Sequence, residues 1–335
     1  MKQYSIGIDI GGTKCAVSLG RGQLPEQGLD GFLLDRIAFP TEVEKGAAHA
    51  LSNIKAAVWE LLRRRGAVPK EAAAVGISCG GPLDYSRGVI LNPPNLCGWE
   101  EVPIVRMMEN EFEIPAFLQN DANACALAEW RFGAARGRRN VIFLTCGTGM
   151  GAGLILDGRL YHGAADMAGE IGHIRMTEIG PVGYGKAGAF EGYCSGSGIA
   201  QLARIKVREA MQAGRRTALC PNGEMPEELT AQTVAEAAKR GDAVAREIYA
   251  ISGRYLGAGL AVLIDLLNPE IIVLGSIYER SKELLWPSMQ EMIQREALPV
   301  SAACCRIVPA QLGDRLGDYA ALSVALLSGA SGAGV

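Results

Sequence analysis

Two glycine-rich turns, each set between apolar strand-like runs, constrain this chain more than any other feature of its sequence. The first lies in GIDIGGTKCAVSLG, residues 7–20, and the second in VIFLTCGTGMGAGLILDGRL, residues 141–160. In the first, Ile6, Ile8 and Ile10 share one face at a period of two, which is typical of a β-strand. Each segment therefore predicts a strand, a tight turn and a second strand.

Strand and helix patterns continue along the whole chain. Strands are predicted at residues 4–10, 15–20, 32–39, 73–78, 116–118, 140–146, 152–156 and 270–275. Helices are predicted at about residues 45–65, 102–112, 122–131, 197–213, 230–239, 242–266, 280–296 and 316–328. Because strands followed by helices occur twice, we expect an α/β chain built of two related halves.

Composition limits the function classes. With 335 residues, 49% of them hydrophobic, the chain can bury a large core in roughly two domains. A net charge of -3 gives no electrostatic basis for binding nucleic acid or an anionic membrane. We expect no targeting segment and no apolar run of the ~18 residues that span a bilayer. Nine cysteines without a CxxC pair suit buried thiols in a reducing compartment, so a cytoplasmic protein is predicted.

The two glycine turns match neither common nucleotide-binding loop. GxxxxGK[ST] is absent, and although residues 147–152 fit GxGxx[GA], they lead into a strand where a dinucleotide-binding turn leads into a helix. Glycines at 147, 149, 151 and 153 leave one face of an extended chain without side chains, so backbone N–H groups could approach an anion. One such loop is most simply a turn without a ligand. Two of them favour phosphate binding.

Several polar residues accompany these turns. Asp9 lies inside an apolar strand, where a carboxylate is costly unless it is paired or holds a metal. Asn120 and Asp121 end another apolar run before an alanine-rich helix, so Asp121 is either a helix N-cap or, beside two phosphate loops, a general base. Glu170 and His173 are either an ordinary polar pair or a pair that recognises sugar hydroxyls.

Taken together, the motifs resemble those of one family. They are DIGGTK at 9–14, GGPLD at 80–84, NPPNLCGW at 92–99, NDANACALAE at 120–129, CGTGMGAGLILDG at 146–158, GEIGH at 169–173, NPEIIVLGS at 268–276 and LGDYAAL at 316–322. In this order they resemble the ROK family of sugar kinases and related repressors over nearly the full length. The resemblance implies an α/β, two-domain, actin-like ATPase (ribonuclease H-like) fold with a central cleft. Its domains would be residues 1–119 with 314–335, and residues 120–313.

The resemblance also implies a role for each motif. Asp121 would be the base that takes a proton from a sugar hydroxyl, usually the 6-OH. The residues implied to bind sugar are Gly81, Asn95, Asn120, Asp121, Glu170, His173 and Glu191. Those implied to bind the nucleotide are Asp9, Gly11, Gly12, Thr13, Lys14, Thr145, Gly147, Thr148 and Gly149 at the phosphates, and Gly275 at the adenosine. The implied cofactors are ATP and Mg²⁺, which Asp9 would hold through water, and the implied assembly is a homodimer.

One segment departs from the family pattern. Members usually carry CxCGxxGCxE after the GH, and its three cysteines bind a structural zinc together with the histidine. Here the segment reads VGYGKAGAFE, with Val182, Tyr184 and Ala189 at the cysteine positions. Because Cys194 alone cannot replace three thiolates, we predict no zinc and a loop held by packing of Tyr184 and Phe190.

Two alternatives to a hexose kinase remain. A repressor of the family would carry a helix-turn-helix domain ahead of the first strand, which here begins within a few residues of Met1, so a repressor is disfavoured. A catalytically weak or silent sugar-binding sensor would keep the sugar residues without turnover. The sequence does not distinguish among glucose, N-acetylmannosamine, N-acetylglucosamine, allose and fructose as the sugar.

Overall fold

The computed structural model describes residues 2–24 and 31–329, and its internal contacts divide the chain into two compact units. Unit 1 comprises Met1–Gly137 and Gln311–Val335, and unit 2 comprises Arg138–Ala310. The sequence predicts domain boundaries at residues 119 and 314, whereas the first part of unit 1 extends to Gly137. The helix that begins at Asp121 therefore belongs to unit 1. The reason is packing, since this helix contacts the C-terminal helix of the same unit.

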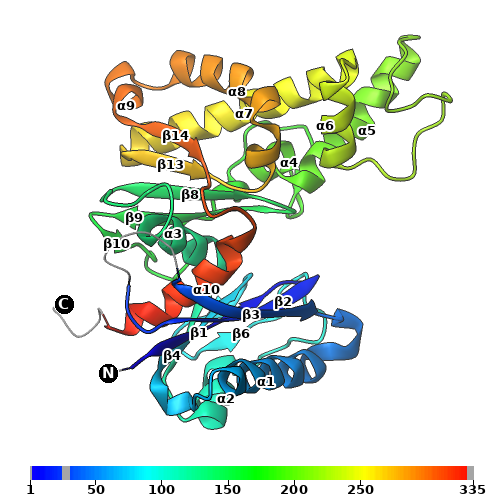
Figure 1. The fold of residues 1–335 in the computed structure, drawn as a ribbon. Coiled ribbons are helices and arrows are strands. Elements are labelled where there is room, and N and C mark those ends of the chain that lie inside the picture. The colour runs from blue at the N-terminus through cyan, green and yellow to red at the C-terminus, as the bar shows by residue number, and fades with distance from the viewer. Residues whose placement is uncertain (1, 25–30, 330–335) are drawn as a thin grey trace. The chain divides into compact units, whose positions relative to one another are not determined.

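Unit 1 contains a five-stranded sheet of order β3-β2-β1-β4-β7 (Figure 1). Its strands are β1 (Tyr4–Ile10), β2 (Lys14–Arg21), β3 (Leu33–Pro40), β4 (Ala72–Cys79) and β7 (Ala116–Asn120). The first three strands pair antiparallel, whereas β1 with β4 and β4 with β7 pair parallel. The parallel strands β1, β4 and β7 therefore end at one edge of the sheet, and their last residues lie near one another.

Helices cover the sheet of unit 1. They are α1 (Gly46–Arg64), α2 (Ile104–Phe112), α3 (Asp121–Arg131) and α10 (Leu316–Ala325). Side chains of α1 and α2, such as Ile54 and Met108, share one core with the sheet, while α3 and α10 build a second around Phe132 and Tyr319. Gly76 of β4 permits the close approach of α10, because a side chain there would collide with the α10 backbone.

Unit 2 repeats the same sheet topology, with the order β10-β9-β8-β13-β14. Its strands are β8 (Val141–Cys146), β9 (Met150–Leu156), β10 (Arg159–Leu160), β13 (Ile271–Leu274) and β14 (Arg306–Pro309). Again two antiparallel pairings are followed by two parallel ones. The prediction of two related halves is therefore confirmed. Asp157 and Gly158 form the turn between β9 and β10, with φ of 51° and 77°.

The helices of unit 2 are α4 (Phe190–Cys194), α5 (Gly196–Gln212), α6 (Ala231–Lys239), α7 (Ala243–Leu267), α8 (Ile277–Glu296) and α9 (Pro299–Cys304). In Figure 1, α7 and α8 run side by side above the sheet. Helix α7 is long and apolar enough to cross a membrane by length and composition alone, with a stretch of mean hydropathy 1.5. Arg246, Glu247, Arg254 and Asp265 interrupt it, so it is not the continuous run of ~18 apolar residues that was expected to be absent. Half of the tested stretch is buried, and Leu256, Leu260 and Ile264 lie in the core.

Short elements complete the units. The short strands are β5 (Leu83–Asp84) and β6 (Val89–Ile90) in unit 1, and β11 (Val182–Gly183) and β12 (Lys186–Ala187) in unit 2. The 3-10 helices are η1 (Val43–Lys45), η2 (Pro69–Glu71), η3 (Ile171–His173), η4 (Gly313–Arg315) and η5 (Leu326–Gly329). The sequence patterns missed these elements except η5, which continues the helix predicted at residues 316–328. They also missed β10, β14, α4 and α9, because two to six residues carry too little periodicity.

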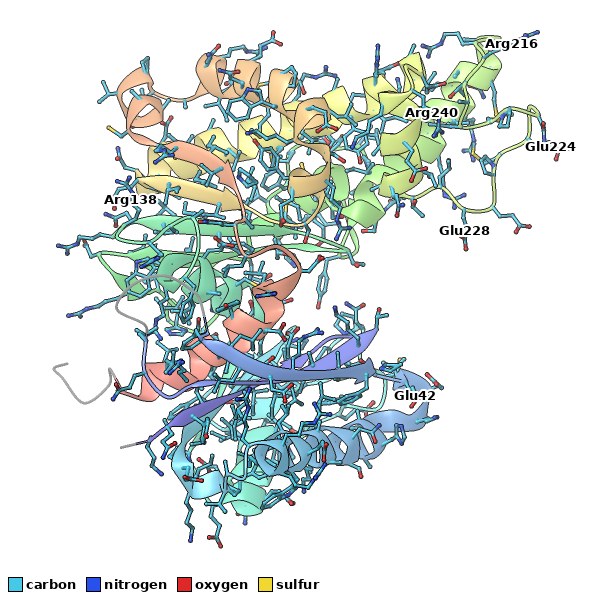
Figure 2. The ribbon with its side chains drawn as sticks, in the orientation of Figure 1. Glu42, Arg138, Arg216, Glu224, Glu228 and Arg240 are labelled. Atoms are coloured by element: carbon cyan, nitrogen blue, oxygen red, sulfur yellow. The ribbon has the colours of Figure 1, made fainter. Side chains whose placement is uncertain are left out.

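Charged side chains of both signs lie on the surface. Figure 2 shows Arg216, Glu224, Glu228 and Arg240 pointing outward around α5 and α6 of unit 2. Of the nine cysteines, Cys97 and Cys304 are exposed, so the expectation of buried thiols is wrong for these two.

Candidate active site

Asp9 lies near the end of β1, opposite Ser78 of β4 in register. Burial, together with the nearby Asp121 and Asp318 carboxylates, raises the pKa of its carboxyl to about 6. Its carboxylate rests against the first turn of α10, where a side chain at Gly317 would collide with it. Helix N-termini favour negative charge, so this position partly compensates a charge that its surroundings otherwise oppose.

The turn after Asp9 is held by the backbone. Gly11 N–H donates to the Lys14 carbonyl at 3.1 Å, and the Thr41 hydroxyl donates to the Gly11 carbonyl at 2.5 Å. Gly12 lies against Asn95, because an added Cβ would come within 2.7 Å of the Asn95 carbonyl oxygen. The structure thus brings together a residue predicted for phosphate and one predicted for sugar, and leaves Thr13 and Lys14 exposed beside them.

Asn120 and Asp121 mark the passage from β7 to α3. Asn120, and not Asp121, is the N-cap, because its side-chain oxygen accepts the N–H groups of Ala122 at 2.9 Å and Asn123 at 3.4 Å. One oxygen of Asp121 accepts the N–H of its neighbour Ala122, at 2.8 Å. The alternative in which Asp121 is the N-cap is therefore wrong, and the sugar role predicted for Asn120 is limited to its amide nitrogen.

Asp121 is accessible to solvent, yet the surrounding protein desolvates its carboxyl enough to raise the pKa, an effect that the Ala122 N–H partly offsets. Gly80 and Gly81 follow β4 beside it. A Cβ on Gly80 would lie 3.9 Å from Asp121 Oδ2, and one on Gly81 would lie 3.7 Å from Asn120 Nδ2. An accessible carboxylate with a raised pKa, next to a stretch without side chains, can accept a proton from a bound hydroxyl.

A metal at this edge would be held indirectly. Across residues 2–24 and 31–329, no group of three or more His, Cys, Asp or Glu side chains could hold a metal ion. The raised pKa of Asp9 shows that its charge is incompletely compensated by the protein. These residues fit a hydrated Mg²⁺ that contacts Asp9 through water, and they do not fit a cation ligated by the protein alone.

In unit 2, the turn between β8 and β9 packs against two helix starts. The Gly147 carbonyl accepts the N–H of Gly196, the first residue of α5, at 2.8 Å, and the Thr148 carbonyl accepts the Ser197 hydroxyl at 2.9 Å. A Cβ on Gly147 would lie 3.7 Å from the Ser276 hydroxyl, just before α8. Gly275, which is predicted to bind the adenosine, is buried and donates its N–H to the Leu144 carbonyl at 3.0 Å. The backbone around Gly147 is thus flanked by helix N-termini, which favour anions.

Of the residues predicted for sugar, unit 2 contains Glu170, His173 and Glu191, and Glu191 lies at the end of the glycine turn. Its Oε2 accepts the N–H of Met150 at 2.9 Å, at the end of the glycine turn. Three glycines surround its side chain: a Cβ on Gly149 would lie 2.9 Å from Oε2, and Cβ atoms on Gly172 and Gly183 would lie 3.3 and 2.9 Å from the Glu191 Cβ. Glu170 is the N-cap of the short helix η3, which contains Gly172 and ends at His173.

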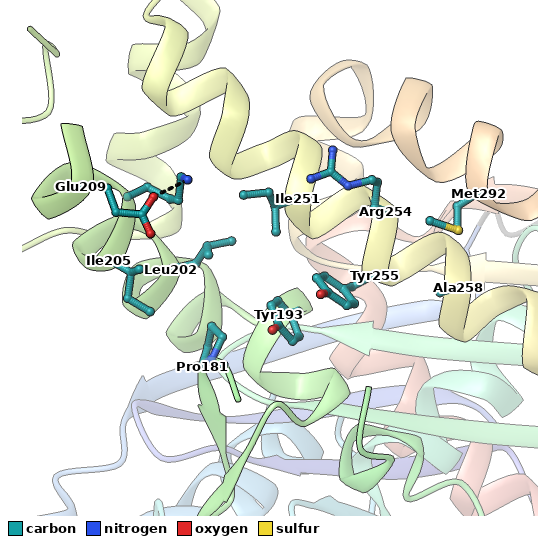
Figure 3. Close-up of a pocket in the computed structure, with 12 residues that line it drawn as sticks. Pro181, Tyr193, Leu202, Ile205, Glu209, Ile251, Arg254, Tyr255, Ala258 and Met292 are labelled. Atoms are coloured by element: carbon teal, nitrogen blue, oxygen red, sulfur yellow. Dashed lines mark hydrogen bonds and ion pairs between the residues drawn. The ribbon is translucent and has the colours of Figure 1, made fainter. Parts of the chain in front are cut away.

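A separate cavity of about 440 Å³ lies in unit 2 (Figure 3). Its lining includes the stacked rings of Tyr193 and Tyr255, whose centroids are 3.6 Å apart, and the Arg254 side chain. Burial raises the pKa of Tyr255 to about 12. None of the residues predicted for the site lines this cavity.

Comparison with known proteins gives the family. The family model described as "ROK family" matches residues 5–326. The chain belongs to the ROK family. Its fold is accordingly the α/β, actin-like ATPase fold of the family, as the sequence predicts.

ROK relatives of this chain include enzymes and regulators. It is 31% identical to a glucokinase of Halalkalibacterium halodurans, over 94% of this chain and 92% of the relative. It is 30% identical to the solved ROK family glucokinase of Streptomyces griseus in complex with glucose and AMPPNP, with a TM-score of 0.71 and coverage of 97% and 98%. It is also 31% identical to the DNA-binding transcriptional repressor Mlc of Escherichia coli, over 68% of this chain and 54% of the repressor.

The sequence alone did not reveal two residues that lie near Asp9. Gly317 and Asp318 belong to the LGDYAAL motif, yet only the structure places them at Asp9. Tyr184 is 67% exposed and meets the His173 ring edge-on at a centroid distance of 4.7 Å, so the prediction that its packing holds the loop is wrong. Phe190, by contrast, is fully buried against Gly259 and the core, as predicted.

Proposed function

We propose that the protein is an ATP-dependent sugar kinase that phosphorylates a hexose hydroxyl, the 6-OH of glucose or of a related hexose or N-acetylhexosamine. The observation that carries this proposal is the accessible carboxylate of Asp121, whose raised pKa suits a general base and whose charge acts on Asp9. Asp9 lies near the end of β1 and Asp121 follows the end of β7, with β4 between these two strands. The glucokinase relatives, and the related structure with glucose and AMPPNP, support the choice of sugar and nucleotide.

In the proposed reaction, Asp121 accepts the proton of the sugar hydroxyl. The hydroxyl oxygen then forms a bond to the γ-phosphorus of ATP, and the bond from that phosphorus to the β-γ bridging oxygen breaks, with its electron pair leaving on ADP. Mg²⁺, held by Asp9 through water, would neutralise charge on the phosphates. The backbone at Gly11 to Lys14 and Thr145 to Gly149 would position the phosphates, Gly275 the adenosine, and Asn95, Glu170, His173 and Glu191 the sugar hydroxyls.

The test is ADP release in the presence of Mg-ATP across a panel of hexoses and N-acetylhexosamines, on protein whose zinc content is known. We expect ADP release that depends on one class of sugar, and equal ADP release with and without sugar would contradict the proposal. The second candidate is a sugar-binding sensor, which the similarity to the Mlc repressor favours. If the protein is a sensor, sugar should raise its melting temperature and no ADP should be released.

The proposal includes a cytoplasmic homodimer that does not bind nucleic acid. Light scattering over a range of protein concentrations measures the molecular mass and so tests the dimer. A monomeric mass at every concentration would refute it.

A further inference from the structure

Residues 174–191, which we call the bracing segment, join the two candidate sugar residues His173 and Glu191. The segment closes on itself, because Phe190 N–H donates to the Ile174 carbonyl at 2.8 Å and Met176 N–H donates to the Gly188 carbonyl at 2.8 Å. Its middle is the two-stranded hairpin of β11 and β12. A closed loop of this kind can transmit a contact on its hairpin to both of its ends.

Gln201 of α5 holds the hairpin from outside the segment. Its side-chain oxygen accepts the Val182 N–H at 2.9 Å, and its side-chain nitrogen donates to the Val182 carbonyl at 2.8 Å. One amide therefore pairs both backbone groups of one residue, as a neighbouring strand would. The next residue, Gly183, packs on the Glu191 side chain, where an added Cβ would lie 3.2 Å from Oε1. The grip of Gln201 on Val182 thus reaches Glu191 through a single residue.

Lys186 of β12 binds His173, the residue that precedes the bracing segment. Its ammonium donates to the His173 carbonyl at 2.7 Å in a partly buried position. The Tyr184 ring of the same hairpin meets the His173 ring at an interplanar angle of 65°. His173 is therefore held at its backbone carbonyl by the hairpin that Gln201 fixes.

We propose that Gln201 and Lys186 are positioning residues for sugar recognition, forming a brace that orients Glu191 and His173 without a metal ion. This inference rests on the proposed function, because it assigns the brace to the sugar residues of that function. Val182, Tyr184 and Ala189, at the positions where the family resemblance places zinc-binding cysteines, offer no thiolate. Hydrogen bonds from Gln201 and Lys186 replace the metal as the link between the two ends of the segment.

The principal test compares Gln201→Ala with Arg208→Ala, a control at an exposed position of the same helix. Losing the paired hydrogen bonds to Val182 should speed amide exchange within residues 180–187 and raise the sugar dissociation constant, measured by calorimetry, about three- to tenfold. The KM for sugar should rise by a similar factor while kcat falls less than twofold. Arg208→Ala should change none of these quantities.

Lys186 offers a test by conservative rescue. Lys186→Ala should raise the KM for sugar, and Lys186→Arg, which keeps an N–H donor for the His173 carbonyl, should restore most of the affinity. If the arginine variant is as impaired as the alanine variant while both melt at the wild-type temperature, Lys186 does not act through this bond and the inference fails.

Failure of the brace and failure of the proposed function are distinguishable. Unchanged exchange in residues 180–187 of Gln201→Ala overturns the brace even in an active kinase. A wild-type protein that neither binds nor phosphorylates any sugar overturns the proposed function, and with it the assignment of the brace to sugar. Stoichiometric zinc whose removal by a chelator loosens residues 174–191 overturns the metal-free brace.

Discussion

The Glu191 carboxylate accepts the backbone N–H of Met150 at 2.9 Å, so a residue predicted to bind sugar is tied to the end of the turn predicted to bind phosphate. Its two oxygens have different surroundings. Oε2 is engaged by Met150 and lies against Gly149, while Oε1 lies toward Gly183. One oxygen of Glu191 can therefore hold the glycine turn while the other faces the hairpin of β11 and β12.

Glu191→Gln and Glu191→Ala should separate these two contributions. The glutamine can still accept the Met150 N–H through its oxygen, but it presents an NH₂ group in place of the second acceptor. We expect the glutamine variant to raise the KM for sugar about tenfold and leave the KM for ATP unchanged. The alanine variant should raise both. Steady-state kinetics with each substrate varied in turn measures the two constants, and equal effects of both variants on ATP would contradict the link.

Asp121→Asn should lower kcat by a factor of about 10² to 10⁴, because the amide cannot accept the proton of the hydroxyl. Calorimetry should show sugar affinity within about threefold of wild type. Because burial raises the pKa of Asp121 and the base must be deprotonated, wild-type kcat should fall as the pH drops through a value above the ordinary aspartate range. A residual activity in Asp121→Asn with the same acidic limb would exclude Asp121 as the titrating base.

Asp9→Asn should stabilise the ligand-free protein at neutral pH while abolishing most of the activity. Folding raises the pKa of Asp9 from 3.8 to about 6, so the folded state favours the protonated form, and stability is lost as the pH rises through this interval. The neutral amide avoids that loss, which corresponds to about 1–3 kcal/mol after allowance for partial solvent access. Urea unfolding at pH 7.5 should show the difference. It should shrink toward zero near pH 4, and a constant difference at both pH values would refute the charge explanation.

Glu129→Gln should destabilise unit 1. The fully buried Glu129 carboxylate accepts three backbone N–H groups, from Ala134 at 2.8 Å and from Gln311 and Leu312 at 2.9 Å each. An amide would direct a donor at one or more of these donors, which costs about 2–4 kcal/mol. Urea unfolding should report the loss, and Glu44→Gln at an exposed position serves as the control. A change below ~0.5 kcal/mol would show that this carboxylate is not needed for the fold.

Prediction from the sequence succeeded where local pattern and burial agree. The strand at residues 4–10 was predicted with its observed bounds, and the helix at 45–65 lies within one residue of α1, because both have long and regular periodicity. The hairpin of β11 and β12 was missed because two-residue strands have no period to detect. The N-cap of α3 shows the same limit at the site. Either Asn120 or Asp121 could cap the helix by residue type, and the backbone geometry decides that Asn120 does.

The sequence by itself determined the family, the two related halves and the residue types available for chemistry, because these depend on residue identity, order and spacing. Only the tertiary structure decided how each group is used: the placement of Asp121 and Asp318 near Asp9, the cap formed by Asn120, and the hold of Gln201 and Lys186 on the bracing segment. The physical reason is that pKa values and hydrogen bonds depend on distance and desolvation, which segments far apart in the chain create only when they pack together.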